Sequence, residues 1–399
     1  MRITRYSRLL ALMLLPAMLC FSGCGKNRWK KQTQQPSAST SVSGTASKGP
    51  IRSGTIRIYA VYPGGVRGAL IHETRTDEQG GYRADISPYA GPIVVEAFGD
   101  YLDEATGRTM TITPDAPLRA ASPSATGDVK VAVSPLTELA VRLAADLTPA
   151  GIEAANLRIS EVFGFDIIDV QPVEPQVSSL FSGYTSQSQI DYTLALAGFS
   201  QMGNGSSAGS VLDRWSAELS GGSVLSEALA AAFQDALTKY LDSGNPNNHT
   251  GASPDDTNLR SVGKKTVLVR MEAFSEFAAG NTLISGVELT LELPAGATVR
   301  HDRATGEVLD ASLTIGAAAP VGALLKGKYS SVASVAGTVK IVLISTAPFT
   351  TGEFSVVSVD APPATVPVLQ NFSITGLKFV GASGVALNGL SARISLTVK

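Results

Sequence analysis

Apolar and polar residues alternate strictly in the C-terminal part of this chain, and this pattern constrains its fold more than any other feature. In GVELTLELP every second residue is apolar, so an extended chain carries four of them on one face: Val287, Leu289, Leu291 and Leu293. Glu288 and Glu292 lie on the opposite face. A period of two is typical of a strand with one buried face. Similar runs separated by turns, such as VKIVLIS and EFSVVSVD, predict a jelly-roll-like β-sandwich over 263–399.

Short strands are also predicted nearer the N-terminus, over 48–125. TIRIYAVY alternates between apolar and polar residues, and TDEQGGYRADI places Asp77 and Gly80 in a turn between two strands. GPIVVEAFG is a short run that contains β-branched residues, which favour strands. Several such strands in so short a range predict a small β-sandwich.

The segment 133–243 has the spacing of helices instead. Ser134 stands before a proline, which is typical of a helix N-cap, and Glu138 is its predicted capping partner. Thr148 is the predicted cap of a second helix that ends at Gly164. A later helix carries an apolar stripe: Leu225, Leu229, Ala232, Phe233, Leu237 and Tyr240. These features predict a central all-α helical bundle.

Two polar segments separate these parts. Residues 24–47 are rich in Ser and Thr without a hydrophobic period, which predicts a flexible tether. Residues 244–262 include SGNPNNHTGASPDDTN, which offers almost nothing to bury and predicts a linker. The fold class is therefore expected to be multidomain β + α: a small N-terminal β-sandwich, a helical bundle and a C-terminal jelly-roll-like sandwich.

The first residues read as a targeting segment rather than as part of a fold. Arg2, Arg5 and Arg8 precede an apolar run that is too short to span a membrane, and small residues follow it. Cleavage after residue 23 would remove a signal peptide over 1–23 and leave Cys24 as the first residue. The alternative is an ordinary secretory peptide cut near Ser22, with Cys24 as a free thiol. A lone thiol is a liability in an oxidising compartment, which favours a modified Cys24.

The stretch Phe21-Ser22-Gly23-Cys24 resembles the lipobox of bacterial lipoproteins, although Phe21 replaces the usual leucine. The resemblance implies that Cys24 is the lipidation site and that acyl chains hold the protein on a membrane. Gly25 after the cysteine, in place of aspartate, implies the outer membrane of the bacterial cell envelope. The predicted localisation is therefore a lipid-anchored envelope protein, either periplasmic or surface-exposed.

Three further resemblances concern folds. KGPIRSGTIRIYAV, TDEQGGYRADI and GPIVVEAFGDYLDEATG resemble the carboxypeptidase-regulatory-like, transthyretin-type sandwich of bacterial surface proteins. VSPLTELA resembles the start of a helical region that follows this sandwich in bacterial lipoproteins. GVELTLELPAGATV and FSITGLKFVGASG resemble the cohesin-like sandwich of the carbohydrate-binding-module superfamily. That family implies binding of a protein module or a polysaccharide.

Composition and motifs narrow the function. A formal net charge of −2 excludes a broad basic surface for nucleic acid. The three histidines, His72, His249 and His301, share no metal-binding spacing and are predicted to be solvated or edge residues. The acidic pairs Asp103-Glu104 and Asp255-Asp256 lack the ligand ladder of a calcium loop, so solvated turn carboxylates are expected. We predict no catalytic residue, no metal site and no cofactor.

The C-terminal sandwich contains no tryptophan and a single tyrosine, Tyr329, whereas sugar-binding platforms usually stack Trp or Tyr on the sugar. Phe372 and Phe379 are predicted to be core residues. A protein partner is therefore favoured over a polysaccharide. The leading hypothesis is a non-catalytic binding and display protein, with Glu288 and Glu292 as candidate binding residues. The alternatives are a structural spacer of an envelope assembly and a hydrolase whose site has no recognisable motif.

Overall fold

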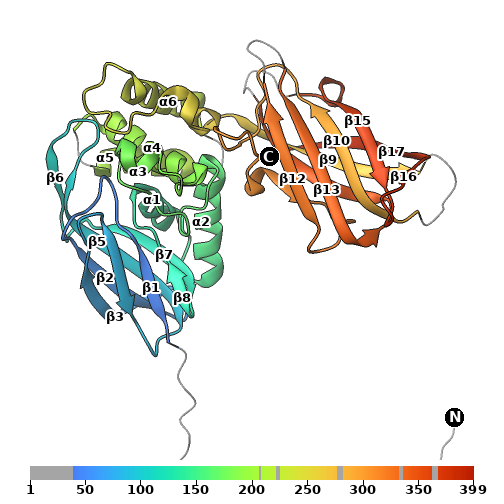
Figure 1. Cartoon of the computed structure of the whole chain (residues 1–399). Helices are drawn as coiled ribbons and strands as arrows, with labels where there is room; N and C mark the ends of the chain where they lie inside the picture. The colour runs from blue at the N-terminus through green and yellow to red at the C-terminus, as the bar shows by residue number, and fades with distance from the viewer. Residues whose placement is uncertain (1–38, 206–207, 222–224, 276–281, 332–335, 362–366) are drawn as a thin grey trace, which may run out of the picture. The chain divides into compact units, whose positions relative to one another are not determined.

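The computed structural model describes residues 39–205, 208–221, 225–275, 282–331, 336–361 and 367–399 (Figure 1). The predicted signal peptide, Cys24 and most of the predicted tether lie outside these ranges. Within them the chain is rich in strands, which form several open sheets, and it contains six α-helices. None of the helices described there is both long and apolar enough to cross a bilayer.

Two sheets form from the N-terminal strands. The three-stranded sheet has the order β4-β1-β8: β4 (Gly81–Asp85), β1 (Ser41–Thr45) and β8 (Asp128–Lys130). The five-stranded sheet contains β3 (Val66–Arg75), β2 (Thr55–Tyr62), β5 (Gly91–Leu102), β6 (Thr109–Ile112) and β7 (Leu118–Ala125). The predicted alternation in β2 is confirmed, because Ile56, Ile58 and Ala60 are buried.

The strands extend beyond the predicted range 48–125 at both ends. Strand β1 lies before residue 48, and β8 lies after residue 125. β1 pairs antiparallel with β4 and parallel with β8, and its Val42 is completely buried. The sequence SVSGT has one large apolar residue, so its period gives no strand signal, and only the pairing with two neighbours makes it a strand.

The helices are α1 (Pro135–Leu143), α2 (Pro149–Phe163), α3 (Val177–Leu180), α4 (Gln187–Gly203), α5 (Ala208–Ser220) and α6 (Glu227–Leu241). The predicted start and stop signals are confirmed: Ser134 and Thr148 cap α1 and α2, and Gly164 ends α2 in the left-handed conformation. The capping partner of Ser134 differs from the prediction. It is Thr137, because this residue stands three positions after the cap, and the Glu138 carboxylate one position further forms ion pairs with Arg119 and Arg142.

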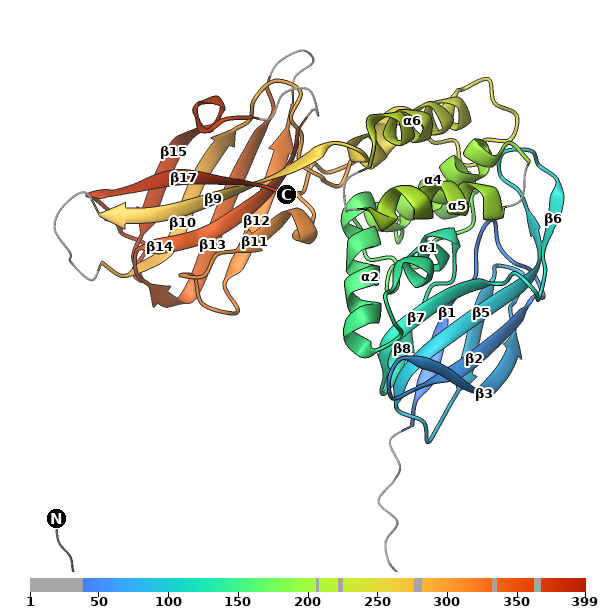
Figure 2. The ribbon, with the colours of Figure 1, turned by 180° about the vertical axis from the view of Figure 1, so that it is seen from behind.

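The helices share one hydrophobic core with the N-terminal strands, so they do not form a self-contained bundle. Helices α1 and α2 pack against β7 (Figures 1 and 2). Aromatic rings fill the helical side of this core, with centroids 4.9–6.2 Å apart: Phe163, Phe199, Trp215 and Phe233. We call residues 39–262 the first unit. In this unit α1 and α2 pack both on each other and on β7, whereas α4 packs on α5 and α6. The spacing of apolar residues along a helix does not reveal whether its buried face contacts a sheet or another helix.

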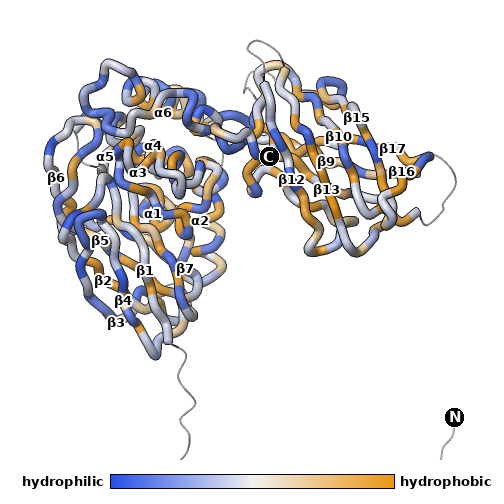
Figure 3. The backbone as a smooth tube through the Cα atoms, viewed as in Figure 1, coloured by the Kyte–Doolittle hydropathy of each residue, from blue (hydrophilic) through white to orange (hydrophobic). Residues whose placement is uncertain are grey.

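The C-terminal strands form two sheets around a second core. One has the order β12-β13-β10-β15-β16: β12 (Leu324–Ser330), β13 (Thr338–Phe349), β10 (Ile284–Glu292), β15 (Ser373–Val380) and β16 (Ala386–Leu387). The other has the order β11-β14-β9-β17: β11 (Leu313–Ile315), β14 (Gly352–Ala361), β9 (Lys265–Ser275) and β17 (Leu390–Val398). Buried and more exposed residues alternate along most of β10 and β13, and hydrophobic stretches recur along the strands of both sheets (Figure 3). This agrees with the predicted β-rich C-terminal part.

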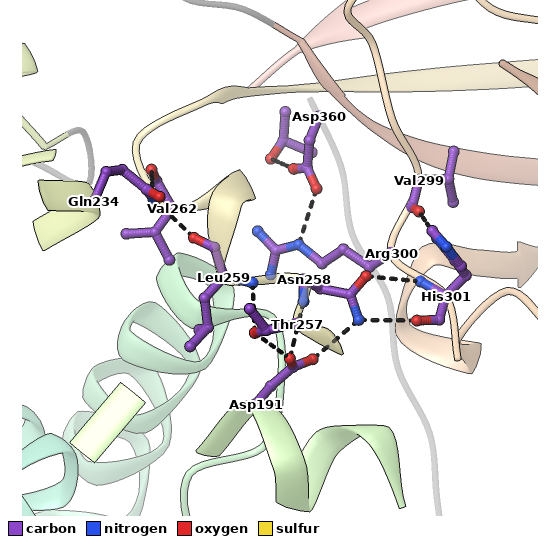
Figure 4. Close-up of polar contacts among 11 residues, drawn as sticks. Asp191, Gln234, Thr257, Asn258, Leu259, Val262, Val299, Arg300, His301 and Asp360 are labelled. Carbon is purple, nitrogen blue, oxygen red and sulfur yellow. Dashed lines mark hydrogen bonds and ion pairs between the residues drawn. The ribbon is translucent and has the colours of Figure 1, made fainter. Parts of the chain in front are cut away.

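The predicted linker over 244–262 is packed more closely than its composition suggests. Thr250, Leu259 and Val262 are buried, and the last two belong to the first core. The side-chain amide of Gln234 on α6 donates hydrogen bonds to the carbonyl oxygens of Leu259 and Val262, at 2.8 and 3.1 Å (Figure 4). Amide, hydroxyl and backbone groups therefore hold a segment that has few apolar residues of its own.

A buried carboxylate anchors the end of this segment (Figure 4). Asp191 on α4 accepts hydrogen bonds from the Thr257 hydroxyl (2.7 Å) and from the backbone and side-chain nitrogens of Asn258 (2.9 and 3.0 Å). The Asn258 amide also donates to the carbonyl oxygen of His301 at 2.9 Å, and its oxygen accepts from the His301 backbone nitrogen at 3.3 Å. Asn258 thus joins α4 to the backbone at His301, which lies in the C-terminal part of the chain.

Candidate binding face

Glu288 and Glu292, the candidate binding residues, lie on the outward face of β10. Their neighbours Val287, Leu289 and Leu291 point inward and are buried in the second core. The strand register therefore confirms the predicted division of this strand into two faces. Cys24, the predicted lipidation residue, lies outside the described residues.

An aliphatic row crosses the outward face of the sheet that contains β10. Cross-strand pairing places five residues in register from β12 to β16: Leu324, Ile344, Gly286, Val380 and Ala386. We call these five residues the aliphatic row. They come from segments far apart in the sequence, and only the sheet order brings them together.

The aliphatic row is open at its β12–β13 end. Leu324 and Ile344 are directly opposite each other and are 56 % and 54 % exposed. At Gly286 the row has no side chain, and a Cβ atom built there would lie 2.7 Å from the Cγ2 atom of Val380. The Val380 side chain therefore lies close against the backbone of Gly286, in space that a side chain at position 286 would need.

A charged row follows directly beside the aliphatic row. The register aligns four residues from β12 to β15: Lys326, Val342, Glu288 and Lys378. Glu288 forms ion pairs with Lys340 at 2.9 Å and with Lys378 at 3.8 Å. The hydrogen bond from Lys340, together with the two positive charges, lowers the pKa of Glu288 below its usual value. Glu288 is therefore ionised at neutral pH and already has partners within the sheet.

Glu292 lies at the far end of the same strand. It accepts hydrogen bonds from the hydroxyls of Ser373 (2.6 Å) and Thr375 (3.4 Å) on β15. The sequence predicts that both glutamates face outward, but it cannot show these partners on other strands. Reasoning from β10 alone also misses the lysines, which outnumber the glutamates on this face: Lys326, Lys328, Lys340 and Lys378.

The arrangement suits recognition of a protein surface. An exposed apolar strip beside charged side chains is typical of protein–protein interfaces, in which a hydrophobic centre has a polar rim. Phe372, Phe379 and Tyr329 of this domain are buried, which confirms the prediction that the two phenylalanines are core residues. These aromatic rings therefore do not offer a flat platform to a sugar.

The other residues considered from the sequence are placed as follows. His72 is half-buried on β3 and His249 is exposed. His301 differs from the prediction of a solvated or edge residue: it is buried, and its ring lies 4.5 Å from that of Tyr329. Asp103 and Glu104 also differ, because they are buried rather than solvated. In the described parts of the chain, no cluster of three or more His, Cys, Asp or Glu side chains could hold a metal ion.

Comparison of the chain with protein families, with curated proteins and with solved structures finds no match.

Proposed function

We propose that this protein is a lipoprotein of the bacterial envelope that acts as a non-catalytic binding and display protein. In this proposal Cys24 carries the lipid anchor, and a transthyretin-type N-terminal sandwich and the helices support a cohesin-like C-terminal sandwich. The outward face of β12, β13, β10 and β15 is the binding surface. The observation that carries the proposal is the aliphatic row, exposed at Leu324 and Ile344 and set beside a charged row.

The chemistry of this face defines the partner. Full burial of an aliphatic side chain contributes about 1.5–3 kcal/mol, so covering Leu324 and Ile344 is a substantial gain for a complex. Four lysines against two glutamates on this outward face favour a partner whose apolar centre is flanked by carboxylates. The proposed partner is therefore a protein with an acidic rim around an apolar patch.

The test replaces Ile344 with aspartate in the full-length protein. A buried charge opposite an apolar surface is strongly unfavourable, so we expect the Ile344→Asp variant to lose the specific partner captured from envelope extracts by the parent. Thr338→Asp is the matched control, because Thr338 occupies the same face of the same strand at its other end. Both variants are expected to keep the melting temperature of the parent within a few degrees.

Three outcomes would count against the proposal. Equal loss of the partner in both variants would mean that an added negative charge anywhere on this face abolishes binding, without a special role for the aliphatic row. Retention of the partner in both variants would mean that the binding site lies on another surface. Failure of the well-folded parent to capture any partner would favour the structural spacer. The anchor is tested separately: the Cys24→Ser variant is expected to lose incorporation of labelled fatty acid and to leave the membrane fraction, and continued labelling would contradict the lipid anchor.

A further inference from the structure

A buried lysine lies in contact with a buried aspartate inside the first unit. Lys48 follows β1 and Asp103 follows β5, and the two are 55 positions apart in the sequence. The Lys48 Nζ atom lies 3.0 Å from the Asp103 Oδ2 atom, and the side chains are only 3 % and 1 % exposed. Removing two charged groups from water costs free energy that their mutual attraction often does not recover. The burial of this pair therefore calls for a reason other than the stability that a surface salt bridge gives.

The backbone fixes this approach. Gly49 has a φ of +69°, and a Cβ atom there would lie 2.1 Å from the carbonyl oxygen of Leu102. Ile51 forms a bridge with Tyr101, and the Arg52 nitrogen donates to the Asp100 oxygen at 3.1 Å. The segment after Lys48 is thus held against the segment before Asp103. The amine and the carboxyl group are held in contact as parts of one fold, which raises their effective concentration greatly.

Both oxygens of the Asp103 carboxyl group have defined neighbours. Oδ2 faces the lysine, whereas Oδ1 accepts hydrogen bonds from the Thr106 backbone nitrogen (3.0 Å) and the Thr106 hydroxyl (2.9 Å). Two donors on Oδ1 are placed to stabilise negative charge that develops on this oxygen during attack at the adjacent carbon. The Lys48 nitrogen lies over the Tyr101 ring, 4.9 Å from the ring centroid. The ring therefore helps to exclude water from the amine.

A second buried carboxyl group completes the cluster. Ser200 on α4 accepts a hydrogen bond from Lys48 Nζ at 3.1 Å and donates one to Glu104 Oε2 at 2.6 Å. The chain of contacts therefore runs from the amine through a hydroxyl to Glu104. Burial raises the pKa of Glu104, which favours a proton on this carboxyl group because the cluster would otherwise hold two negative charges against one positive charge.

We propose that Lys48 and Asp103 condense into an intramolecular isopeptide bond, with Glu104 as the proton shuttle. A proton first passes from the Lys48 ammonium group to the Asp103 carboxylate, which leaves a neutral amine and a neutral acid. The amine attacks Asp103 Cγ, and its surplus proton passes through Ser200 to Glu104. Glu104 returns its other proton to the departing Oδ2 group, which leaves as water. One C–O bond breaks and one C–N bond forms, without oxidation or reduction.

The surroundings accommodate this reaction. A small cavity of about 40 Å³ is lined by Asp103, Glu104 and Tyr240, and it is large enough to receive a released water molecule. The sequence has two cysteines, at positions 20 and 24, so no disulfide can join later parts of the chain. An amide between Lys48 and Asp103 would link the segment after β1 covalently to the segment after β5.

This inference does not depend on the proposed binding function.

Peptide mapping of the full-length protein after denaturation tests the bond. Without it, trypsin releases 32–48 and 84–108 as separate peptides. With it, trypsin does not cut after Lys48, and 32–52 is found joined to 84–108, lighter than the sum of the two by one water molecule. We expect the joined species in the parent protein. Recovery of the separate peptides alone would overturn the proposal.

The role of Glu104 has its own test. The Glu104→Gln variant can still accept a hydrogen bond from Ser200 but cannot shuttle a proton, so the bond should form on the order of 10²-fold more slowly during refolding. Glu174→Gln is the matched control, because Glu174 lines the same cavity but pairs with Arg52. If Glu104→Gln forms the joined peptide as fast as the parent, Glu104 is not the shuttle. If Glu104→Gln does not fold, the peptide map of the parent protein still decides whether the bond exists.

Discussion

At the scale of single residues, buried polar groups are the main departure from what the sequence predicts. Asp103, Glu104, Asp191 and His301 are all buried, and each has defined hydrogen-bond partners. Charged and polar residues are usually exposed, and they are buried only where partners compensate for lost water. Lys48, Ser200 and Asn258, which contact Asp103, Glu104 and Asp191 respectively, are distant in sequence, so a local pattern gives no sign of them, whereas His301 bonds the carbonyl oxygen of the nearby Val299.

His301 gives a pH dependence at this scale. Burial lowers the pKa of its imidazole below the ordinary value of about 6.5. Its Nδ1–H group donates to the Val299 carbonyl oxygen at 2.7 Å, and Nε2 faces the Arg303 guanidinium at 3.2 Å, so the neutral ring fits this environment. Below about pH 6.5 the imidazole takes up a proton more readily in the unfolded chain than in the folded one. The free energy of unfolding therefore falls as pH decreases below this value.

We therefore expect the melting temperature to decrease between about pH 7 and about pH 5, and to decrease less in the His301→Phe variant. Phenylalanine keeps a ring beside Tyr329 but cannot titrate. Thermal unfolding followed by circular dichroism at several pH values provides the measurement. Identical pH profiles of the two proteins would show that His301 does not control this loss of stability.

At the scale of elements, local signals at helix ends and along strands are reliable here. The Ser134 hydroxyl accepts hydrogen bonds from the backbone nitrogens of Leu136 and Thr137, at 3.1 and 3.4 Å, as its position before Pro135 predicts. The hydroxyl also lies 2.7 Å from that of Tyr192 on α4. The same side chain thus caps α1 and joins it to another helix, and only the first of these roles is visible in the sequence.

Replacement of Ser134 by alanine is expected to destabilise the protein by about 1–2 kcal/mol, because the backbone nitrogens lose their cap inside the core. The measurement is chemical denaturation of both proteins. Ser186→Ala at the start of α4 is the comparison, since that cap is exposed and its hydroxyl bonds with Gln189, three residues further along the same helix. An equal or larger loss for Ser186→Ala would contradict the added role of Ser134.

At the scale of the whole chain, residues 39–262 and the C-terminal strands have separate hydrophobic cores. Polar contacts of Asn258 connect α4 to the backbone of His301, and Arg303 adds hydrogen bonds to Gln187 and to the Asp255 carbonyl oxygen. Apart from Leu259 and Val262, which are buried in the first core, polar contacts hold the segment between the cores. Its resistance to local opening depends on these polar groups.

We expect the Asn258→Ala variant to be cleaved several-fold faster by protease within 253–264, because Asp191 and the His301 carbonyl group lose their common donor. Limited proteolysis followed by mass spectrometry locates the cut. Asn371→Ala is the control, since that side chain accepts one local hydrogen bond from Val368. Unchanged cleavage in Asn258→Ala would show that other contacts hold the segment.

The sequence by itself determined the elements: the period of two in β10, the caps at Ser134 and Thr148, and the stop at Gly164 all depend on residues close in the chain. Only the tertiary structure decided which elements share a core, because an apolar helix face fits a sheet as well as another helix. It also aligned Leu324 with Ile344, and it brought Lys48 into contact with Asp103. Such contacts depend on strand order and chain crossing, which no short sequence pattern encodes.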